Sequence, residues 1–130
     1  MLTLQEQSLN WSLNHALNVG DTDVFPRPFE YEAIKHDWDN IKSYLAEQDI
    51  LSWATRPART LLSPKAKYGF RVITQLDPID FLIFSALVYE IAEDIENRRI
   101  SVTDKTVFSY RVKTTQEGQL FDPEVGYRSF

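Results

Sequence analysis

The segment from Asp77 to Arg99 constrains the fold more than any other part of the sequence. Asp77 is a favourable N-cap residue, Pro78 suits the first helical position, and Asp80 adds negative charge to the first turn. Apolar residues then recur at helical spacing. They are Ile79, Leu82, Ile83, Ala86, Leu87, Ile91 and Ile95. The pattern predicts one long amphipathic helix that forms the spine of the core, with the first five of these side chains the most buried.

Helical patterns also fill the N-terminal part of the chain. Apolar residues recur at helical spacing after Thr3 and Glu6, which have the spacing of a capping box, and Gly20 suits a left-handed C-terminal residue. These signals predict a helix over residues 4–19. Residues 30–49 predict one or two further helices, with Asp37 capping the second. The apolar face of this second region comprises Ile34, Trp38, Ile41 and Leu45.

Residues 56–76 differ from both helical regions. Pro57 and Pro64 exclude a long helix, residues 65–69 form a turn that contains Gly69, and a β-branched segment follows. This is the pattern of an antiparallel hairpin, and residues 105–114 predict a further short strand. The predicted fold class is therefore α+β, with an N-terminal helical region at 1–55. The hairpin, long helix and strand at 56–130 complete the same compact unit.

The hairpin region also concentrates positive charge. Residues 50–76 contain five cations and no Asp or Glu; because the chain carries −5, the remaining residues sum to −10. Such a region attracts phosphates or an anionic partner. Alternatively, the cations protect an exposed strand edge from aggregation, and nearby Trp53 either packs in the core or stacks on a base. The five cations are Arg56, Arg59, Lys65, Lys67 and Arg71.

Composition excludes several kinds of site. The chain has no cysteine, so it has no disulfide, zinc–thiolate site or thiol nucleophile. Together with the lack of a signal-like leader, this predicts a cytoplasmic protein, and the longest apolar run is too short to span a membrane. His15 and His36 lack metal-ligand spacing. We interpret the acidic residues Glu90, Glu93, Asp94 and Glu96 as a solvated helix face and predict no metal or catalytic residue.

Several short motifs follow one another around the hairpin. They are Pro64-Lys65, Gly69-Phe70-Arg71, the helical segment Asp77 to Arg99, and the sequence FSYR at 108–111. In this order they resemble the fingers region of bacterial reverse transcriptases. The segment GDTDVFPRPFEYEAI at 20–34 is similar to the leader of uncharacterised reverse-transcriptase groups associated with phage (antiviral) defence. The resemblance covers about residues 10–130 and implies part of an RNA-directed DNA polymerase, which is a nucleotidyltransferase.

The resemblance implies a role for the five cations of residues 50–76 and for Arg111. Lys65 and Arg71 would bind the triphosphate of the incoming nucleotide, because a lysine point charge and a planar arginine fork both suit phosphate oxygens. Arg111 would face the backbone of the RNA or DNA template. Further template phosphates would be bound by Arg56, Arg59 and Lys67.

The family's chemistry also requires residues that this chain does not have. Its polymerases hold two Mg²⁺ ions with a palm aspartate and an aromatic-x-Asp-Asp turn, whereas this sequence contains no adjacent Asp pair. We therefore expect the N-terminal and fingers portion of a polymerase, lying before the palm, with no cofactor of its own and no activity alone. Its partners would be nucleotides, the template, and the remainder of the polymerase or a second copy. The alternative is a non-catalytic module that docks an acidic partner or nucleic acid through its basic hairpin.

Overall fold

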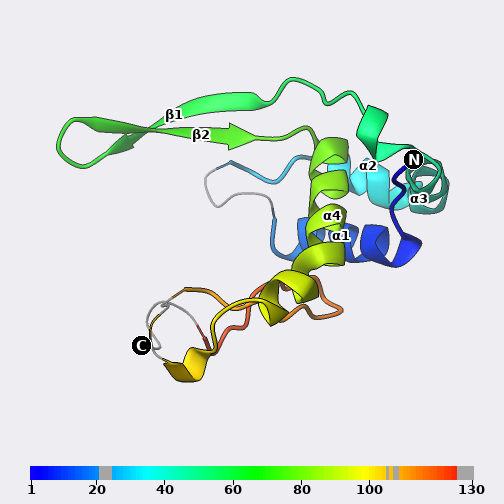
Figure 1. The fold of residues 1–130 in the computed structure, drawn as a ribbon. Coiled ribbons are helices and arrows are strands. Elements are labelled where there is room, and N and C mark those ends of the chain that lie inside the picture. The colour runs from blue at the N-terminus through cyan, green and yellow to red at the C-terminus, as the bar shows by residue number, and fades with distance from the viewer. Residues whose placement is uncertain (21–24, 105, 107–108, 126–130) are drawn as a thin grey trace.

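The computed structural model describes residues 1–20, 25–104, 106 and 109–125, and in it a β-hairpin projects from a helical body (Figure 1). The described helices are α1 (Glu6–Asn18), α2 (Glu30–His36), α3 (Trp38–Ala46) and α4 (Pro78–Asn97). Strands β1 (Arg59–Lys65) and β2 (Gly69–Gln75) pair antiparallel, and short 3₁₀ helices occupy Ile50–Ser52 and Val102–Asp104. The predicted α+β fold class is confirmed.

Helix α4 starts as its sequence predicts. The Asp77 side chain accepts a hydrogen bond of 3.0 Å from the N–H of Ile79, and Pro78 occupies the first helical position. Leu82, with Ile83 and Ala86, is buried as expected, whereas Ile79 is only partly buried. Neither α4 nor any other described helix combines the length and apolar composition needed to cross a membrane.

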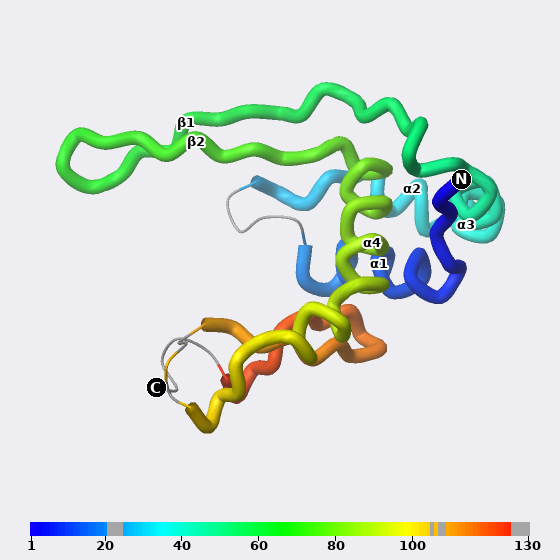
Figure 2. Tube along the Cα trace, in the orientation of Figure 1, coloured from blue at the N-terminus to red at the C-terminus, as the bar shows by residue number. Residues whose placement is uncertain are grey.

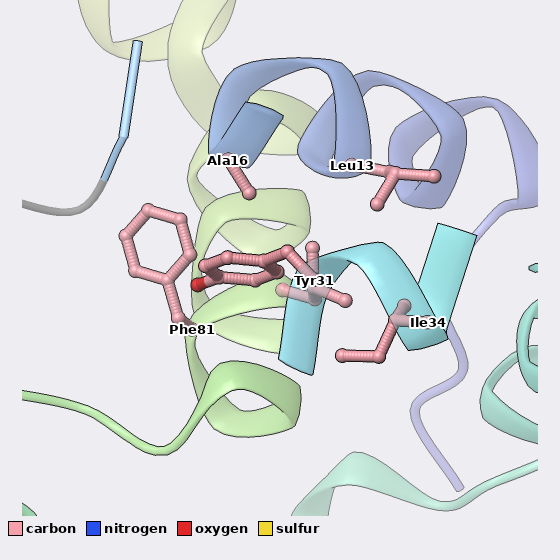
Figure 3. Close-up of a cluster of buried hydrophobic side chains, with 6 residues drawn as sticks. Leu13, Ala16, Tyr31, Ile34 and Phe81 are labelled. Atoms are coloured by element: carbon pink, nitrogen blue, oxygen red, sulfur yellow. The ribbon is translucent and has the colours of Figure 1, made fainter. Parts of the chain in front are cut away.

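Two hydrophobic clusters meet on α4. In the first, the ring of Tyr31 from α2 packs edge-on against Phe81 of α4, with centroids 6.4 Å apart (Figure 3). Trp38, Ile41 and Ile79 pack against both clusters, so α4 shares one core with the N-terminal helices. The other buried members of the first cluster are Leu13, Ala16, Ile34 and Leu82, and those of the second are Leu4, Leu9, Leu45, Ile83 and Ala86.

The predicted apolar stripe of α4 is wrong in its second half. Ile91 and Ile95 are 50% and 49% exposed, and Leu87 is only partly buried. Apart from Ala92, the buried residues of α4 lie between positions 80 and 86. Helix α1 crosses α4 instead of running along it (Figure 1), so the N-terminal helices cover little of the second half.

The ends of the N-terminal helices agree only in part with prediction. The Thr3 capping box is wrong: Gln5 occupies the N-cap position of α1, and its backbone N–H donates to the Glu90 carboxylate at 2.8 Å. Gly20 does adopt the left-handed conformation, with φ of 90°. The second helical region forms two helices, one of the two predicted arrangements, and they divide at Asp37. The predicted Asp37 side-chain cap is wrong, because this side chain accepts a hydrogen bond from the Asn40 side chain and none from a backbone N–H of α3.

The further strand predicted at 105–114 does not form in the described part of that segment. Val112 makes an isolated β-bridge with Phe121, and its N–H donates to the side chain of Glu96. The bonds beside this bridge run from the Lys113 N–H to the carbonyl of residue 120 and from the Asp122 N–H to the Arg111 carbonyl, so the Val112 N–H points away from Phe121 and toward α4. Residues 105, 107 and 108 lie outside the described residues.

The segment that follows is fastened to α1 by polar side chains. Trp11, Asn14 and Asn18 donate hydrogen bonds of 2.9 to 3.1 Å to successive backbone carbonyls, those of residues 115, 116 and 117. The His15 ring bonds the next carbonyl, that of residue 118, at 2.6 Å. These bonds fix the loop 115–118 along the surface of α1.

Candidate nucleic-acid interface

The hairpin Arg59–Gln75, called the arm below, extends away from the helices (Figure 2). Lys65 pairs with Gly69 across a loop of three residues. Two of these, Lys67 and Tyr68, have φ of 63° and 64°, a left-handed conformation that costs about 1–2 kcal/mol for residues other than glycine. The loop holds Tyr68 with its side chain fully exposed.

Strand register places the cations of the two strands on one face of the arm. Arg71 pairs with Ser63 and Lys65 with Gly69, so Lys65 and Arg71 are diagonal neighbours on the same face, about 7–8 Å apart. Arg59, paired with Gln75, lies on this face nearer the helical body. Gly69 leaves the surface beside Lys65 open because it has no side chain.

The arm cations also lack acidic partners. Elsewhere, Arg27, Lys42, Arg99 and Lys113 all form ion pairs within the described part of the chain. The described cations that form none are Lys35, Arg59, Lys65, Lys67, Arg71 and Arg98. Four of these six are on the arm, so its positive charge is available to an external anion.

The remaining two predicted cations have partners. Arg56, just before the arm, lies 3.2 Å from the Asp77 carboxylate. Arg111 lies 2.5 Å from the Glu96 carboxylate, and its side chain is only 12% exposed. Because Glu96 and Asp77 are near opposite ends of α4, Arg111 is about 30 Å from the base of the arm. The fold therefore brings Lys65 and Arg71 together near Lys67 at the tip of the arm, places Arg59 about 20 Å from Lys65 along the same face, and keeps Arg111 away from all of them.

A buried carboxylate positions the base of the arm. Asp80 accepts hydrogen bonds from the indole N–H of Trp53 at 2.7 Å and from the backbone N–H of Arg56 at 2.6 Å. Asp80 is 6% exposed, so both bonds are largely shielded from water. The sequence predicts only that Asp80 lies in the first turn of the helix, and nothing in its local pattern indicates the contacts with Trp53 and Arg56. The indole N–H of Trp53 therefore already has a hydrogen-bond acceptor within the protein.

The acidic face of α4 is not simply solvated, contrary to the sequence interpretation. Glu90 accepts from Gln5 N–H and from the Ser8 hydroxyl at 2.5 Å. Burial alone would raise the pKa of Glu96, but the hydrogen bond from the Val112 N–H and two neighbouring guanidinium groups outweigh burial and lower that pKa below its ordinary value. Glu93 and Asp94 are exposed as expected. Among the described residues, no group of three potential ligands is arranged to hold a metal ion.

No protein-family model, curated protein or solved structure matches this chain. Its function must therefore be inferred from the placement of its own residues.

Proposed function

We propose that the arm binds the phosphates of nucleotides and of a single-stranded template, as the fingers of an RNA-directed DNA polymerase. The observation that carries this proposal is the common face of Lys65 and Arg71, which are diagonal neighbours without acidic partners in the described residues. Their long side chains reach the same or adjacent phosphate groups. Gly69 leaves room for those phosphates beside Lys65.

The other arm cations extend the phosphate-binding surface. Arg59 lies on the same face nearer the body, and Lys67 lies at the tip. Both add attraction that does not depend on base sequence. The exposed ring of Tyr68 offers a flat surface on which an unpaired base can stack.

The proposed role is binding, and the chemistry belongs to a palm. The two-metal reaction needs Mg²⁺ held by carboxylates, including the Asp-Asp pair that this sequence lacks. We therefore expect the purified chain to extend no primer when it is given template, deoxynucleotides and Mg²⁺. Template-dependent extension that survives removal of contaminating polymerases would contradict this assignment.

Binding can be tested by fluorescence anisotropy with labelled single-stranded RNA over a series of salt concentrations. Affinity should be weak and should fall with salt, because only four arm cations can engage phosphates. Lys65→Ala combined with Arg71→Ala should lower the affinity and reduce the salt slope by about 1.4, since each phosphate on a single strand contributes about 0.7.

The structure supplies a matched control. Lys35 and Arg98 are exposed, carry the same charge as the test pair, and have no acidic partner among the described residues. Arg99 is unsuitable because it bonds Glu96 and the backbone carbonyl of residue 110. Lys35→Ala with Arg98→Ala should leave RNA binding almost unchanged.

Equal losses from the two double variants would mean diffuse electrostatic attraction and would refute a specific phosphate site on the arm. Binding of an acidic peptide through Lys65 and Arg71, with no binding of RNA or nucleoside triphosphate, would instead favour a non-catalytic module that docks an acidic protein.

A further inference from the structure

The face of the arm opposite the cations is apolar and uncovered. The strand register places Leu62 opposite Val72 and Pro64 opposite Phe70, with Thr60 and Thr74 completing the face. Leu62, Phe70 and Val72 are 59–68% exposed, and no charged residue lies among them. A two-stranded ribbon is marginally stable in water by itself, so a large apolar face on it is a strong indication of a binding partner.

Helix α4 has a second uncovered apolar surface. Phe84, Ile91 and Ile95 follow one side of the helix and are each about half exposed. At the end of this stripe nearest the arm, Phe84 and Leu87 line a groove of about 590 Å³. Isolated exposed apolar residues are ordinary, but a helical stripe that ends in a groove is a contiguous patch.

The two surfaces are continuous at the base of the arm. The apolar face follows β2 from Phe70 through Val72 to Thr74, and Leu76 comes directly after this strand; Ala58 comes directly before β1. Ala58 and Leu76 both line the groove that contains Phe84. The arm and α4 therefore form one L-shaped apolar surface, while Lys65 and Arg71 point away from it.

We propose that this L-shaped surface binds a second copy of the chain, with the arm of each copy lying along the α4 stripe of the other. The two limbs have similar lengths: Phe70 to Leu76 spans about 20 Å of strand, and Phe84 to Ile95 spans about 17 Å of helix. A twofold axis makes such a surface self-complementary, because each copy supplies one arm and one stripe.

The charge distribution favours a second copy as the occupant. The arm carries four cations and no acid, whereas the residues outside 50–76 sum to −10. Within one copy the arm projects away from that acidic body (Figure 1). Asp94 and Arg98 both line the surface beside Ile91 and Ile95 and form no ion pair among the described residues, so the attraction comes from the acidic body as a whole. The arm of another copy is therefore attracted to the acidic body, and the apolar contacts then hold it there.

The first test is the oligomeric state of the whole chain by analytical ultracentrifugation over a range of concentrations. We expect a monomer–dimer equilibrium. An arm variant, Leu62→Lys with Val72→Glu, removes apolar surface but keeps net charge and gives the cross-strand pair opposite charges. A stripe variant, Ile91→Glu with Ile95→Lys, forms a favourable i, i+4 pair. Each should weaken dimerisation at least about tenfold.

The control variant uses exposed apolar residues away from this surface. Val19 and Tyr44 are 47% and 56% exposed, and Val19→Lys with Tyr44→Glu should leave the dimer intact. Circular dichroism should show the same helix content for all variants. A wild-type chain that stays monomeric at high concentration would overturn the proposal, as would a dimer that the arm and stripe variants leave unchanged.

Mixing the two variants tests which limb contacts which. In a heterodimer of the arm and stripe variants, the intact arm of one chain meets the intact stripe of the other, so one of two contacts survives. We therefore expect the mixture to dimerise more strongly than either variant alone. If mixing restores nothing, arms do not bind stripes and the proposed arrangement is wrong. These results do not depend on RNA binding, because Lys65 and Arg71 lie on the opposite face.

Discussion

Replacing Asp80 with alanine should test how the arm is anchored. The side chain is 6% exposed and accepts hydrogen bonds from Trp53 and from the backbone N–H of Arg56. Asp80→Ala removes both acceptors at once. The indole N–H and the backbone N–H then lose their partners in a largely apolar region, lined also by Ile83 and Leu87.

The expected loss can be worked from these contacts. A hydrogen bond to a charged group contributes about 1.5–3 kcal/mol, so two give about 3–6 kcal/mol. Loss of a negative charge in the first turn of α4 adds about 0.3–1 kcal/mol. Water entering the neighbouring groove partly satisfies the freed donors, so we expect about 3–4 kcal/mol. This is a large fraction of the 5–15 kcal/mol typical of a folded domain.

Urea unfolding followed by circular dichroism measures the change in the free energy of unfolding. Tryptophan fluorescence should also change, because Trp53 loses its bond to Asp80. Asp80→Asn should be intermediate, since the amide keeps one acceptor for Trp53 but presents a donor toward the Arg56 N–H. Asp94→Ala, on the exposed side of the same helix, should cost less than about 0.5 kcal/mol. A loss below about 1 kcal/mol for Asp80→Ala would refute the anchoring role.

Four further substitutions have expected outcomes. Leu82→Ala, at a fully buried position, should lower the free energy of unfolding by about 2–5 kcal/mol in urea denaturation, and Leu87→Ala should cost less because Leu87 is only partly buried. Gly118→Ala should destabilise the chain and expose the loop 115–118 to hydrogen exchange. The φ of Gly118 is 92°, and a Cβ at this position would lie 2.4 Å from the backbone nitrogen of His15. Because folding lowers the pKa of Glu96, ionised Glu96 stabilises the fold at pH values above the ordinary glutamate pKa. This stabilisation is lost as the pH falls through the folded-state pKa, so Glu96→Gln should flatten the acid limb of a stability–pH profile.

Local signals in the sequence were sufficient for most element positions. The Asp77-Pro78 start of α4, the turn at Gly69 and the division at Asp37 depend on residues within a few positions of one another. Backbone preferences of this kind act over one turn and do not require a distant partner. For the same reason, periodicity assigned Ile91 to the correct type of element but could not reveal that the crossing helix α1 leaves it uncovered.

Contacts between distant residues account for what could not be predicted. The Glu90 carboxylate bonds the N–H of Gln5, 85 residues away in sequence, and Glu96 bonds Arg111 and the Val112 N–H. A run of acids cannot show which of its members will receive such donors. The candidate site likewise depends on contacts between distant residues. The sequence shows its five cations, but only the fold shows that Arg56 is ion-paired whereas the arm cations form no ion pair among the described residues.

The period-two alternation of a strand would let one arm serve both proposed partners, phosphate and a second copy of the chain. Substituting Lys65 and Arg71 alters the cationic face without touching the apolar side chains, and substituting Leu62 and Val72 does the reverse. A projecting ribbon of two strands has little stability of its own. Binding of its apolar face to a second copy would restrict the arm, so that the opposite face loses less conformational entropy when it binds phosphate. Dimerisation and phosphate binding would then favour one another through the rigidity of the arm, although neither partner touches the other.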